Sequence, residues 1–419
     1  MDGRIKMEGK TGRGNLVGWT GLVLTMLLLI TGCQSHFWDK QGSSGQEVKL
    51  LAIGDNLIHS SVYDAADAED GVMDGKYNFK PMYKAIKGRV KSADIAFVNQ
   101  ETIISGKQYG LYGYPKFNTP EDVLPALKDT GFTIANATTN HSLDRTDQGA
   151  YNAIKNFKRY KMDYIGINAS AKEAKKIKVV KKKGISFAFL AYTYGTNGIQ
   201  AKHDYTVNYI DAKRIKGDVK KARQQADIVI VSMHWGTENS FAPDDWQVKL
   251  AKKMADWGVD LIIGTHPHTI QPVKWVKGKG NHKMLVTYSL GNGLNGMLET
   301  QNMLGCLFTC KFVKANQKIQ LKEPKMEPIV SHFERIGEIP VDVESLRKNA
   351  PNADHVNYTF KFRLYPLSEY SEDQLSRHFI NVYQGENAHM EDLQRLYDRV
   401  ISKEFRKVTH ENKEKTKQN

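Results

Sequence analysis

The sequence predicts an α/β fold, in which apolar strands alternate with helices around a sheet. From residue 47 to residue 268, short apolar runs and segments with helical spacing follow one another. Two later runs, 282–293 and 305–314, have no long helix between them, which indicates some antiparallel pairing. Several of the apolar runs end in Asp, Glu, Asn or His, at the sheet edge where α/β proteins place their sites.

The predicted strands are rich in apolar residues and bounded by polar ones. They cover 47–55, 94–101, the beginning of 132–144, 184–194, 226–236, 259–268, 282–293 and 305–314. The predicted helices carry apolar residues at helical spacing and cover 80–93, 121–131, 148–161 and 244–258. Gly131 is expected to end the second helix, because glycine readily adopts the left-handed conformation that closes a helix.

Length and composition describe a globular protein with an anionic partner. The chain has 419 residues, of which 40% are hydrophobic and 25% charged, so it can bury one large core or two ordinary ones. The formal net charge is +14, and lysines cluster in 171–184 and in the tail 405–419. A basic balance suits an anionic surface polymer, a membrane surface or nucleic acid. No nucleic-acid-binding module is visible, so a surface polymer is the preferred partner and nucleic acid is not expected.

The N-terminus predicts export and lipid anchoring. Four basic residues precede the apolar run 16–30, which is short for a transmembrane helix, and small residues follow it. We interpret 1–32 as a signal peptide and "ITGC" as a lipobox, in which Cys33 is diacylated and becomes the mature N-terminus. Residues 33–47 then form a polar tether. The protein is expected on the extracytoplasmic face of a bacterial cell membrane, and an uncleaved anchor would leave it on the same face.

The other two cysteines, Cys306 and Cys310, lie on one predicted strand. They would share a face of that strand but lie too far apart along it to form a disulfide. We interpret both as small hydrophobic core residues.

The polar residues at the strand ends are ligands of one chemical kind. In "GTHPH" two histidines follow an apolar run; if the backbone stays extended, their imidazoles project to the same side. An isolated pair of this kind is equally consistent with two hydrogen-bonded loop histidines. Several strands repeat the pattern, however, and carboxylate, amide and imidazole groups together suit divalent manganese, iron or zinc. The strand ends that carry these groups supply Asp55, Glu101, Asn140, His141, His234, His266 and His268.

In combination and order, these motifs resemble those of the poly-γ-glutamate capsule biosynthesis (CapA-type) proteins. The motifs are "AIGDNLIH", "DIAFVNQET", "NATTNHSLDRTDQG", "VSMHWGTE", "GTHPHTIQP" and "YSLGNG", which span roughly residues 48–300. That family is similar in turn to calcineurin-like metallophosphoesterases. The resemblance implies a sandwich of two β-sheets flanked by helices over 48–335. A helical extension with a basic tail, 336–419, would follow it.

Carried over by position, the resemblance implies two divalent metal ions. Asp55 and His268 would hold the first ion, and Glu101 would bridge the two. The ligands of the second ion would be Asn140, His234 and His266. The proline between the two histidines would then direct one imidazole to each ion.

The same resemblance implies a proton donor. His141 matches the residue that protonates a leaving group, and Asp144 would orient it; Asp144 could instead be a helix cap. The wider superfamily has a histidine two residues after its first aspartate, whereas here the candidate is His59, four residues after. Asn292, in "SLGNG", is either a turn residue or a further site residue.

Three functions remain open on these grounds. The first is a surface lipoprotein of poly-γ-glutamate biogenesis that acts beside membrane-bound polymer synthase subunits. The second is a secreted metal-dependent phosphodiesterase or phosphatase, because a two-metal site suits phosphate esters. The third is a non-catalytic subunit that binds the polymer.

Overall fold

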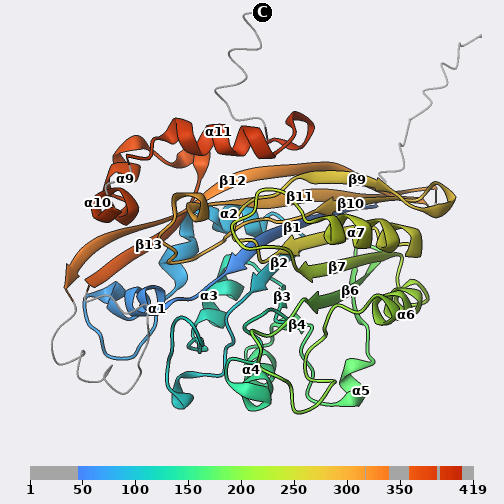
Figure 1. Cartoon of the computed structure of the whole chain (residues 1–419), viewed down its shortest axis with the longest axis horizontal. Coiled ribbons are helices and arrows are strands. Elements are labelled where there is room, and N and C mark those ends of the chain that lie inside the picture. The colour runs from blue at the N-terminus through green and yellow to red at the C-terminus, as the bar shows by residue number, and fades with distance from the viewer. Residues whose placement is uncertain (1–45, 317, 339–357, 385–386, 408–419) are drawn as a thin grey trace, which may run out of the picture. The chain divides into compact units, whose positions relative to one another are not determined.

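Two β-sheets form the centre of the protein (Figure 1). The computed structural model describes residues 46–316, 318–338, 358–384 and 387–407. The seven-stranded sheet has the order β13-β12-β11-β1-β2-β3-β4, and the six-stranded sheet has the order β5-β6-β7-β8-β10-β9. The predicted α/β class and the two-sheet sandwich flanked by helices are therefore confirmed.

The seven-stranded sheet is parallel in one half and antiparallel in the other. β1 to β4 are parallel, whereas β11 pairs antiparallel with β1 and with β12, and β12 pairs antiparallel with β13. The antiparallel pairing expected late in the chain is thus present. The strands are β1 (Gln46–Asn56), β2 (Ile95–Gln100), β3 (Ile134–Asn136), β4 (Asp163–Ile165), β11 (Leu304–Ala315), β12 (Lys318–Glu338) and β13 (Tyr358–Pro366).

The six-stranded sheet has a parallel centre and antiparallel edges. β6, β7, β8 and β10 run parallel, and β5 and β9 pair antiparallel with β6 and β10. Its strands are β5 (Lys178–Lys182), β6 (Ile185–Thr193), β7 (Ile228–His234), β8 (Leu261–Thr265), β9 (Val273–Lys277) and β10 (Lys283–Thr287).

Three hydrophobic clusters hold the layers together. Successive residues of a strand face opposite sides of the sheet, so one strand can contribute to two clusters. Leu50 and Ala52 of β1 lie in the cluster between the two sheets, and Leu51 and Ile53 lie in the cluster under the helices. A third cluster joins the outer face of the six-stranded sheet to its own helices. The strands are apolar on both faces because both faces are covered.

Helices cover the outer face of each sheet. Gly131 ends α3 in the left-handed conformation (φ 115°), as predicted. The segment expected to be helical at 80–93 begins with 3₁₀ turns over Lys80–Ile86. The helices on the seven-stranded sheet are α1 (Ser60–Asp67), α2 (Lys87–Lys91), α3 (Val123–Thr130) and α4 (Thr146–Arg159). Those on the six-stranded sheet are α6 (Ala212–Arg223) and α7 (Asp245–Trp257), and a short helix, α5 (Ala171–Ala174), precedes β5.

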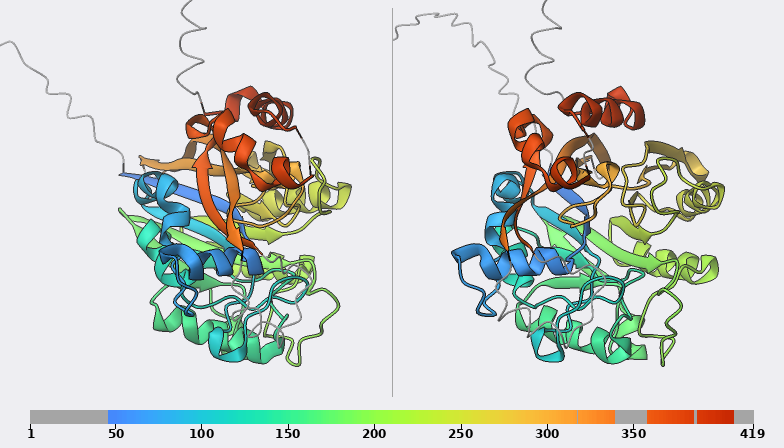
Figure 2. Two further views of the ribbon diagram at one scale, coloured as in Figure 1. Left: turned by 90° about the vertical axis from the view of Figure 1, so that its left-hand side faces the viewer. Right: turned by 60° about the vertical axis from the view of Figure 1, so that its left-hand side comes forward.

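The C-terminal region contains strand as well as helix. The predicted helices are present as α9 (Glu372–Arg377), α10 (Phe379–Gln384) and α11 (Met390–Val400), and Figure 2 shows them beside β12 and β13. Two parts of the region expected to be helical are extended instead. β12 continues to Glu338, and β13 joins the sheet because Phe360, Phe362 and Leu364 alternate with less buried residues and pack in the core.

The predicted signal peptide, Cys33 and nearly all of the tether lie outside the described residues; β1 begins at Gln46. Within the ranges given above, no helix is long and apolar enough to cross a membrane. Cys306 and Cys310 are buried, unpaired and part of the core between the sheets, as predicted.

Candidate metal centre

The polar residues predicted at the strand ends meet at one edge of the two sheets. Asp55 lies near the end of β1, Glu101 follows β2, and His234 ends β7. His266 follows β8 directly, and all four side chains are buried. Parallel strands bring their carboxyl ends to the same edge, so positions far apart in the chain converge there.

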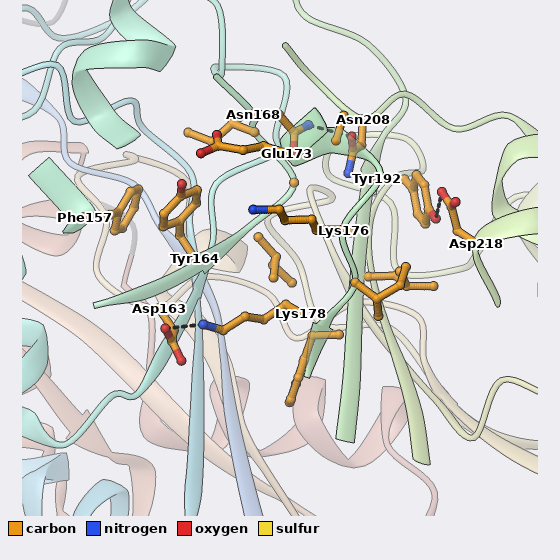
Figure 3. Close-up of a pocket in the computed structure, with 18 of the residues that line it drawn as sticks. Phe157, Asp163, Tyr164, Asn168, Glu173, Lys176, Lys178, Tyr192, Asn208 and Asp218 are labelled. Carbon is orange, nitrogen blue, oxygen red and sulfur yellow. Dashed lines mark hydrogen bonds and ion pairs between the residues drawn. The ribbon is translucent and has the colours of Figure 1, made fainter. Parts of the chain in front are cut away.

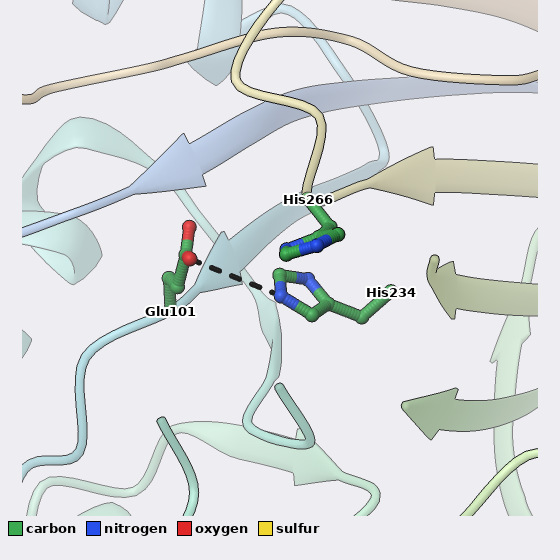
Figure 4. Close-up of side chains that lie close together, drawn as sticks. All are labelled: Glu101, His234 and His266. Carbon is green, nitrogen blue, oxygen red and sulfur yellow. Dashed lines mark ion pairs between the residues drawn. The ribbon is translucent and has the colours of Figure 1, made fainter. Parts of the chain in front are cut away.

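Two groups of potential metal ligands share one carboxylate. Asp55, Glu101 and His268 form one group, in which the ligand atoms lie within 4.8 Å of one another. Glu101, His234 and His266 form the other under the same limit (Figure 4). Glu101 Oε1 lies 3.8 Å from His234 Nε2 and 3.6 Å from His268 Nε2. The grouping matches the distribution of ligands over two sites that the family resemblance implied.

Asn140 joins the second group through its amide oxygen. Its Oδ1 lies 2.9 Å from Nε2 of His234, and its Nδ2 donates to Asn197 Oδ1 (3.3 Å). An amide oxygen fixed beside an imidazole nitrogen is placed to act as a further ligand of the same ion.

The residues of this centre fit a divalent cation, because three of their buried polar atoms have no hydrogen-bond partner. Neither carboxylate oxygen of Glu101 has a hydrogen bond, and neither does Nδ1 of His266, although both residues are buried. An unsatisfied buried neutral group costs about 1–3 kcal/mol, and a charged one costs more. Buried polar atoms are normally paired, so three unpaired atoms in one cluster indicate a missing positive partner.

The electrostatics of the ligands agree with this interpretation. Burial raises the pKa of Glu101 well above its usual range and lowers the pKa of His234 and His266 well below theirs. Burial also disfavours the imidazolium of His268, but Glu101 and Asp55 outweigh that effect and raise its pKa to about 10. Burial thus favours the neutral form of these two imidazoles, which is the form that binds a metal.

Hydrogen bonds from surrounding residues fix the orientation of the ligands. Asn292 Oδ1 lies 3.0 Å from His268 Nδ1, and Thr265 Oγ1 lies 3.0 Å from His234 Nδ1. The Oδ1 atom of Asp55 accepts a hydrogen bond from Asn99 Nδ2 (2.7 Å). Such contacts hold metal ligands in place, so the structure places Asn292, a further candidate from the sequence, beside a ligand.

A close approach between two backbone segments places Asp55. Its N–H donates to the carbonyl oxygen of Gly291 (3.0 Å), and its own carbonyl accepts from Gly293 (2.8 Å). A Cβ atom on Gly54 would lie 1.8 Å from that same Gly291 oxygen, so only glycine fits before Asp55. The close approach of Gly54 and Gly291 therefore brings the residues that follow them, Asp55 and Asn292, together.

The backbone of "GTHPH" differs from the expected extended form. His266 and His268 both have positive φ angles, 100° and 57°, which is rare for residues other than glycine. The amide of His266 donates to Asp55 Oδ2 (3.2 Å), and the Pro267 carbonyl accepts from Asn239 (2.8 Å). The prediction that an extended backbone aligns the two imidazoles is wrong; a hydrogen-bonded turn directs them, and their ring centroids lie 5.9 Å apart.

His141 and Asp144 form a buried pair beside the ligands. Asp144 Oδ2 lies 2.7 Å from His141 Nδ1 and also accepts the Phe117 amide (2.7 Å). The Phe117 ring contacts the His141 ring, with centroids 4.7 Å apart. When Nδ1 carries the proton shared with Asp144, Nε2 is the nitrogen left to exchange a proton with a substrate. Asn140 and His141 both lie in a turn.

His59 lies apart from both groups of potential ligands in the described structure. It precedes α1, its Nδ1 lies 3.1 Å from the amide of Gly296, and its ring contacts Phe117. Phe117 therefore contacts both His59 and His141.

Sequence reasoning missed three residues at this centre. Glu238, four residues after His234, forms a third group of potential ligands with His266 and His268. Tyr194 lies over His266, with ring centroids 4.5 Å apart, and burial raises its pKa to about 12. Asn197 contacts both Asn140 and His141. Glu238 had a signal in the sequence as the last residue of "VSMHWGTE", and Tyr194 as the last residue of the predicted strand 184–194.

Comparison with known proteins identifies the family. Residues 49–297 match the family model described as "Bacterial capsule synthesis protein PGA_cap". The chain is 34% identical over 177 residues to the "PGA biosynthesis protein CapA" of Bacillus subtilis (strain 168), covering 42% of this chain and 45% of that protein. It is 33% identical over 178 residues to the "Capsule biosynthesis protein CapA" of Bacillus anthracis, covering 41% and 42%. The match thus spans less than half the length of either relative.

A solved structure aligns with part of this chain at low similarity. The NAD nucleotidase (NadN) of Haemophilus influenzae aligns with 74% of this chain and 64% of its own, at 11% identity and a TM-score of 0.43. The family model, by contrast, covers more than half of the sequence and includes every residue of the two groups that share Glu101. The chain belongs to the bacterial capsule synthesis (PGA_cap) family of CapA-type poly-γ-glutamate capsule proteins.

Proposed function

We propose that this chain is a membrane-anchored, extracytoplasmic protein of poly-γ-glutamate biogenesis whose metal centre performs a hydrolytic step. The observation that carries the proposal is the buried Glu101 carboxylate, which has no hydrogen-bond partner and is shared by two groups of ligands. A site built only for structure would pair such a carboxylate with a donor. Family membership supplies the polymer, and the basic net charge of +14 suits its carboxylates.

The residues present would hold two divalent ions, one for each group that contains Glu101. When bound, such ions activate water near neutral pH and polarise the group under attack. Asp55 and His268 would hold the first, and His234, His266 and Asn140 the second. Asn292 and Thr265 would keep the imidazoles in place through their Nδ1 atoms.

His141 is placed to act as the general acid. Its Nδ1 is held by Asp144 at 2.7 Å, so the ring keeps one orientation and Nε2 delivers the proton to the leaving atom. Asp144 is buried and has a second fixed contact to the Phe117 amide, so it stays aligned through the reaction. This pair favours a catalytic role over a purely polymer-binding one, because binding alone needs no oriented proton donor.

A second candidate reaction is hydrolysis of a phosphate ester, on a surface polymer or a small molecule. Two ligand groups that share one carboxylate favour it, since paired metal ions suit in-line attack at phosphorus. The same residues would serve in the same roles, and only the bond that breaks would differ.

A substrate screen separates these reactions. Purified full-length protein, loaded with manganese, iron or zinc in turn, is incubated with γ-linked glutamate oligomers and with an alkyl and an aryl phosphodiester. Release of shorter glutamate oligomers supports the polymer reaction, and turnover of the phosphodiesters alone supports the second candidate. No turnover of any substrate by protein that retains its metals contradicts both hydrolytic reactions and leaves polymer binding as the function.

The membrane anchor rests on the lipobox and is tested separately. Cys33→Ala should abolish labelling of the protein by a radioactive or clickable palmitate analogue in growing cells. Cys306→Ala is the matched control, because that cysteine is buried in the core and should not affect labelling. Equal labelling of Cys33→Ala and wild type would contradict the anchor.

A further inference from the structure

A pocket separate from the candidate metal centre lies between the edges of the two sheets (Figure 3). Its volume is about 500 Å³, and it is lined by residues of β4, β6, the end of α4 and the segment that leads from α5 into β5. The volume is in the range of pockets that hold organic ligands, which is about 300–1,000 Å³. None of the predicted metal ligands lines it.

The pocket carries two lysines that are not neutralised. Lys158 pairs with Glu173 (3.1 Å) and Lys178 pairs with Asp163, so these charges balance. Lys161 and Lys176 also line the pocket, but their ammonium groups form no salt bridge or hydrogen bond with the described residues. Both lysines are exposed, so both can meet an incoming anion.

The third carboxylate of the pocket, Asp218, is already engaged. It accepts a hydrogen bond from the Tyr192 hydroxyl (3.1 Å) and lies 3.3 Å from Lys221 and 3.7 Å from Arg214. The pocket therefore has a positive balance, supplied in part by the lysine cluster 171–184 that predicted an anionic partner.

The remaining walls offer an apolar face and an amide. Phe157 and Tyr164 stack with centroids 5.2 Å apart and form one side of the pocket (Figure 3). Asn208 Oδ1 accepts a hydrogen bond from Asn168 (3.0 Å), and the Nδ2 of Asn208 has no partner among the described residues. Aliphatic carbons can pack on the rings, and the free amide N–H can donate to a carbonyl oxygen.

We propose that this pocket binds a segment of a carboxylate-bearing polyamide, with Lys161 and Lys176 pairing with two of its carboxylates. The proposal rests on the proposed function where it names that polymer as poly-γ-glutamate. Such a chain presents carboxylates, amide carbonyls and methylene groups, which match the lysines, Asn208 and the aromatic wall. A denser anion such as a polyphosphate fits less well, because Asp163 and Glu173 stand beside the lysines.

The pocket is linked to the metal centre by one stretch of chain. Residues 194–208 begin with Tyr194, whose ring packs against that of His266, and include Asn197, which contacts Asn140 and His141. They end at Asn208 in the pocket. A polymer segment held in the pocket would therefore contact one end of a loop whose other end contacts the candidate catalytic residues.

Calorimetric binding of a γ-linked glutamate tetramer tests the proposal. Full-length protein is titrated in EDTA, so that metal ions do not contribute to binding. Lys161→Ala with Lys176→Ala should weaken affinity about tenfold, since two exposed ion pairs contribute about 0.7 kcal/mol each. The matched control is Lys274→Ala with Lys277→Ala, which removes two exposed lysines of β9 and should leave the affinity unchanged.

The other outcomes decide against the pocket or separate it from the proposed function. Equal affinity of the pocket variant and wild type, or no binding by wild type, overturns the proposal. The proposal is also overturned, in favour of a general anion site, if inorganic phosphate displaces the tetramer at the same concentration as glutamate does. Binding lost only in Glu101→Ala would move the polymer to the metal centre. Binding that needs the two lysines supports the pocket, even if the metal-loaded protein turns over no substrate.

Discussion

Two buried histidine clusters in this protein differ in how their polar atoms are satisfied. Between α9 and α10, His378 donates from Nε2 to the Ser331 carbonyl of β12 (3.1 Å) and accepts the Ile380 amide at Nδ1 (3.1 Å). His332 Nδ1 hydrogen bonds with the Tyr370 hydroxyl (2.7 Å). At the candidate metal centre, by contrast, the carboxylate oxygens of Glu101 and Nδ1 of His266 are buried without hydrogen-bond partners.

The difference separates a histidine cluster whose hydrogen bonds are satisfied within the fold from one whose unpaired atoms suit a metal ion. The cluster of His332 and His378 completes the packing of β12, β13 and α10 and has no need of a further group. In the cluster around Glu101, the carboxylate oxygen Oε1 lies less than 4 Å from Nε2 of His234 and from Nε2 of His268. Burial of histidine alone therefore does not identify a site, whereas burial with unpaired ligand atoms does.

The largest expected effect is the loss of catalysis when His141, beside the candidate metal centre, is replaced. His141→Ala should lower kcat by about 10²–10⁴-fold while metal content stays at the wild-type level, because a proton donor is lost and no ligand is. The loss should be greatest for a substrate with a poor leaving group. Asn140→Ala should instead lower metal content, and activity with it.

His378→Ala is the matched variant in the other cluster. It should leave kcat and metal content unchanged and lower the free energy of unfolding by about 1–3 kcal/mol, because Ser331 and Ile380 lose their partner. Metal analysis, steady-state kinetics and urea unfolding on the three variants check both statements. Metal loss in His141→Ala would make that residue a ligand, contrary to the assignment.

Metal addition should sharpen the comparison through stability. A metal concentration 100 times its Kd adds about 2.7 kcal/mol to the free energy of unfolding for each site, because only the folded chain forms the site. The gain should be present in His332→Gln and reduced in His234→Ala, and differential scanning calorimetry with and without EDTA measures it. An equal gain in both variants would mean that the ion binds elsewhere.

The smallest effect is a pH dependence that belongs to the satisfied cluster. Burial lowers the pKa of His378 to about 4, and burial with the neighbouring His378 lowers that of His332 to about 3. In the unfolded chain both histidines have a pKa of about 6.5. Below that pH the unfolded state binds more protons than the folded state, so the free energy of unfolding falls. The loss continues until the folded-state pKa is reached.

Urea unfolding at pH 7 and pH 5, in EDTA, tests that sign. Wild type should lose about 2 kcal/mol more than His378→Gln between these two values, if the histidine stays neutral in the folded state. The same loss in both proteins would show that His378 does not control the acid sensitivity.

Eight of the strands could be predicted from the sequence because each is a short apolar run between polar residues. Five strands were missed: β4, β5, β9, β12 and β13. In β13, Phe360, Phe362 and Leu364 alternate as in a strand, but helical segments follow it closely. The candidate ligands could be predicted because they follow strand ends, where topology brings them together.

The remaining features of the centre depend on tertiary contacts. The positive φ angles of His266 and His268 depend on hydrogen bonds to Asp55 and from Asn239, which are remote in the chain. Tyr194 directly follows β6, but tyrosine is not one of the ligand types that marked the other strand ends, and Asn197 lies further along the same loop. Unpaired atoms, as on Glu101, become visible only when all neighbours are in place.

The metal content of Glu101→Ala tests the central claim most directly. Wild-type protein, Glu101→Ala and the exposed control Glu391→Ala of α11 are purified in parallel, loaded with manganese or zinc, desalted and analysed by mass spectrometry for bound metal. Because Glu101 is shared by both ligand groups, the variant should lose both ions, and the control should keep as many as wild type. Full metal occupancy in Glu101→Ala would contradict the account.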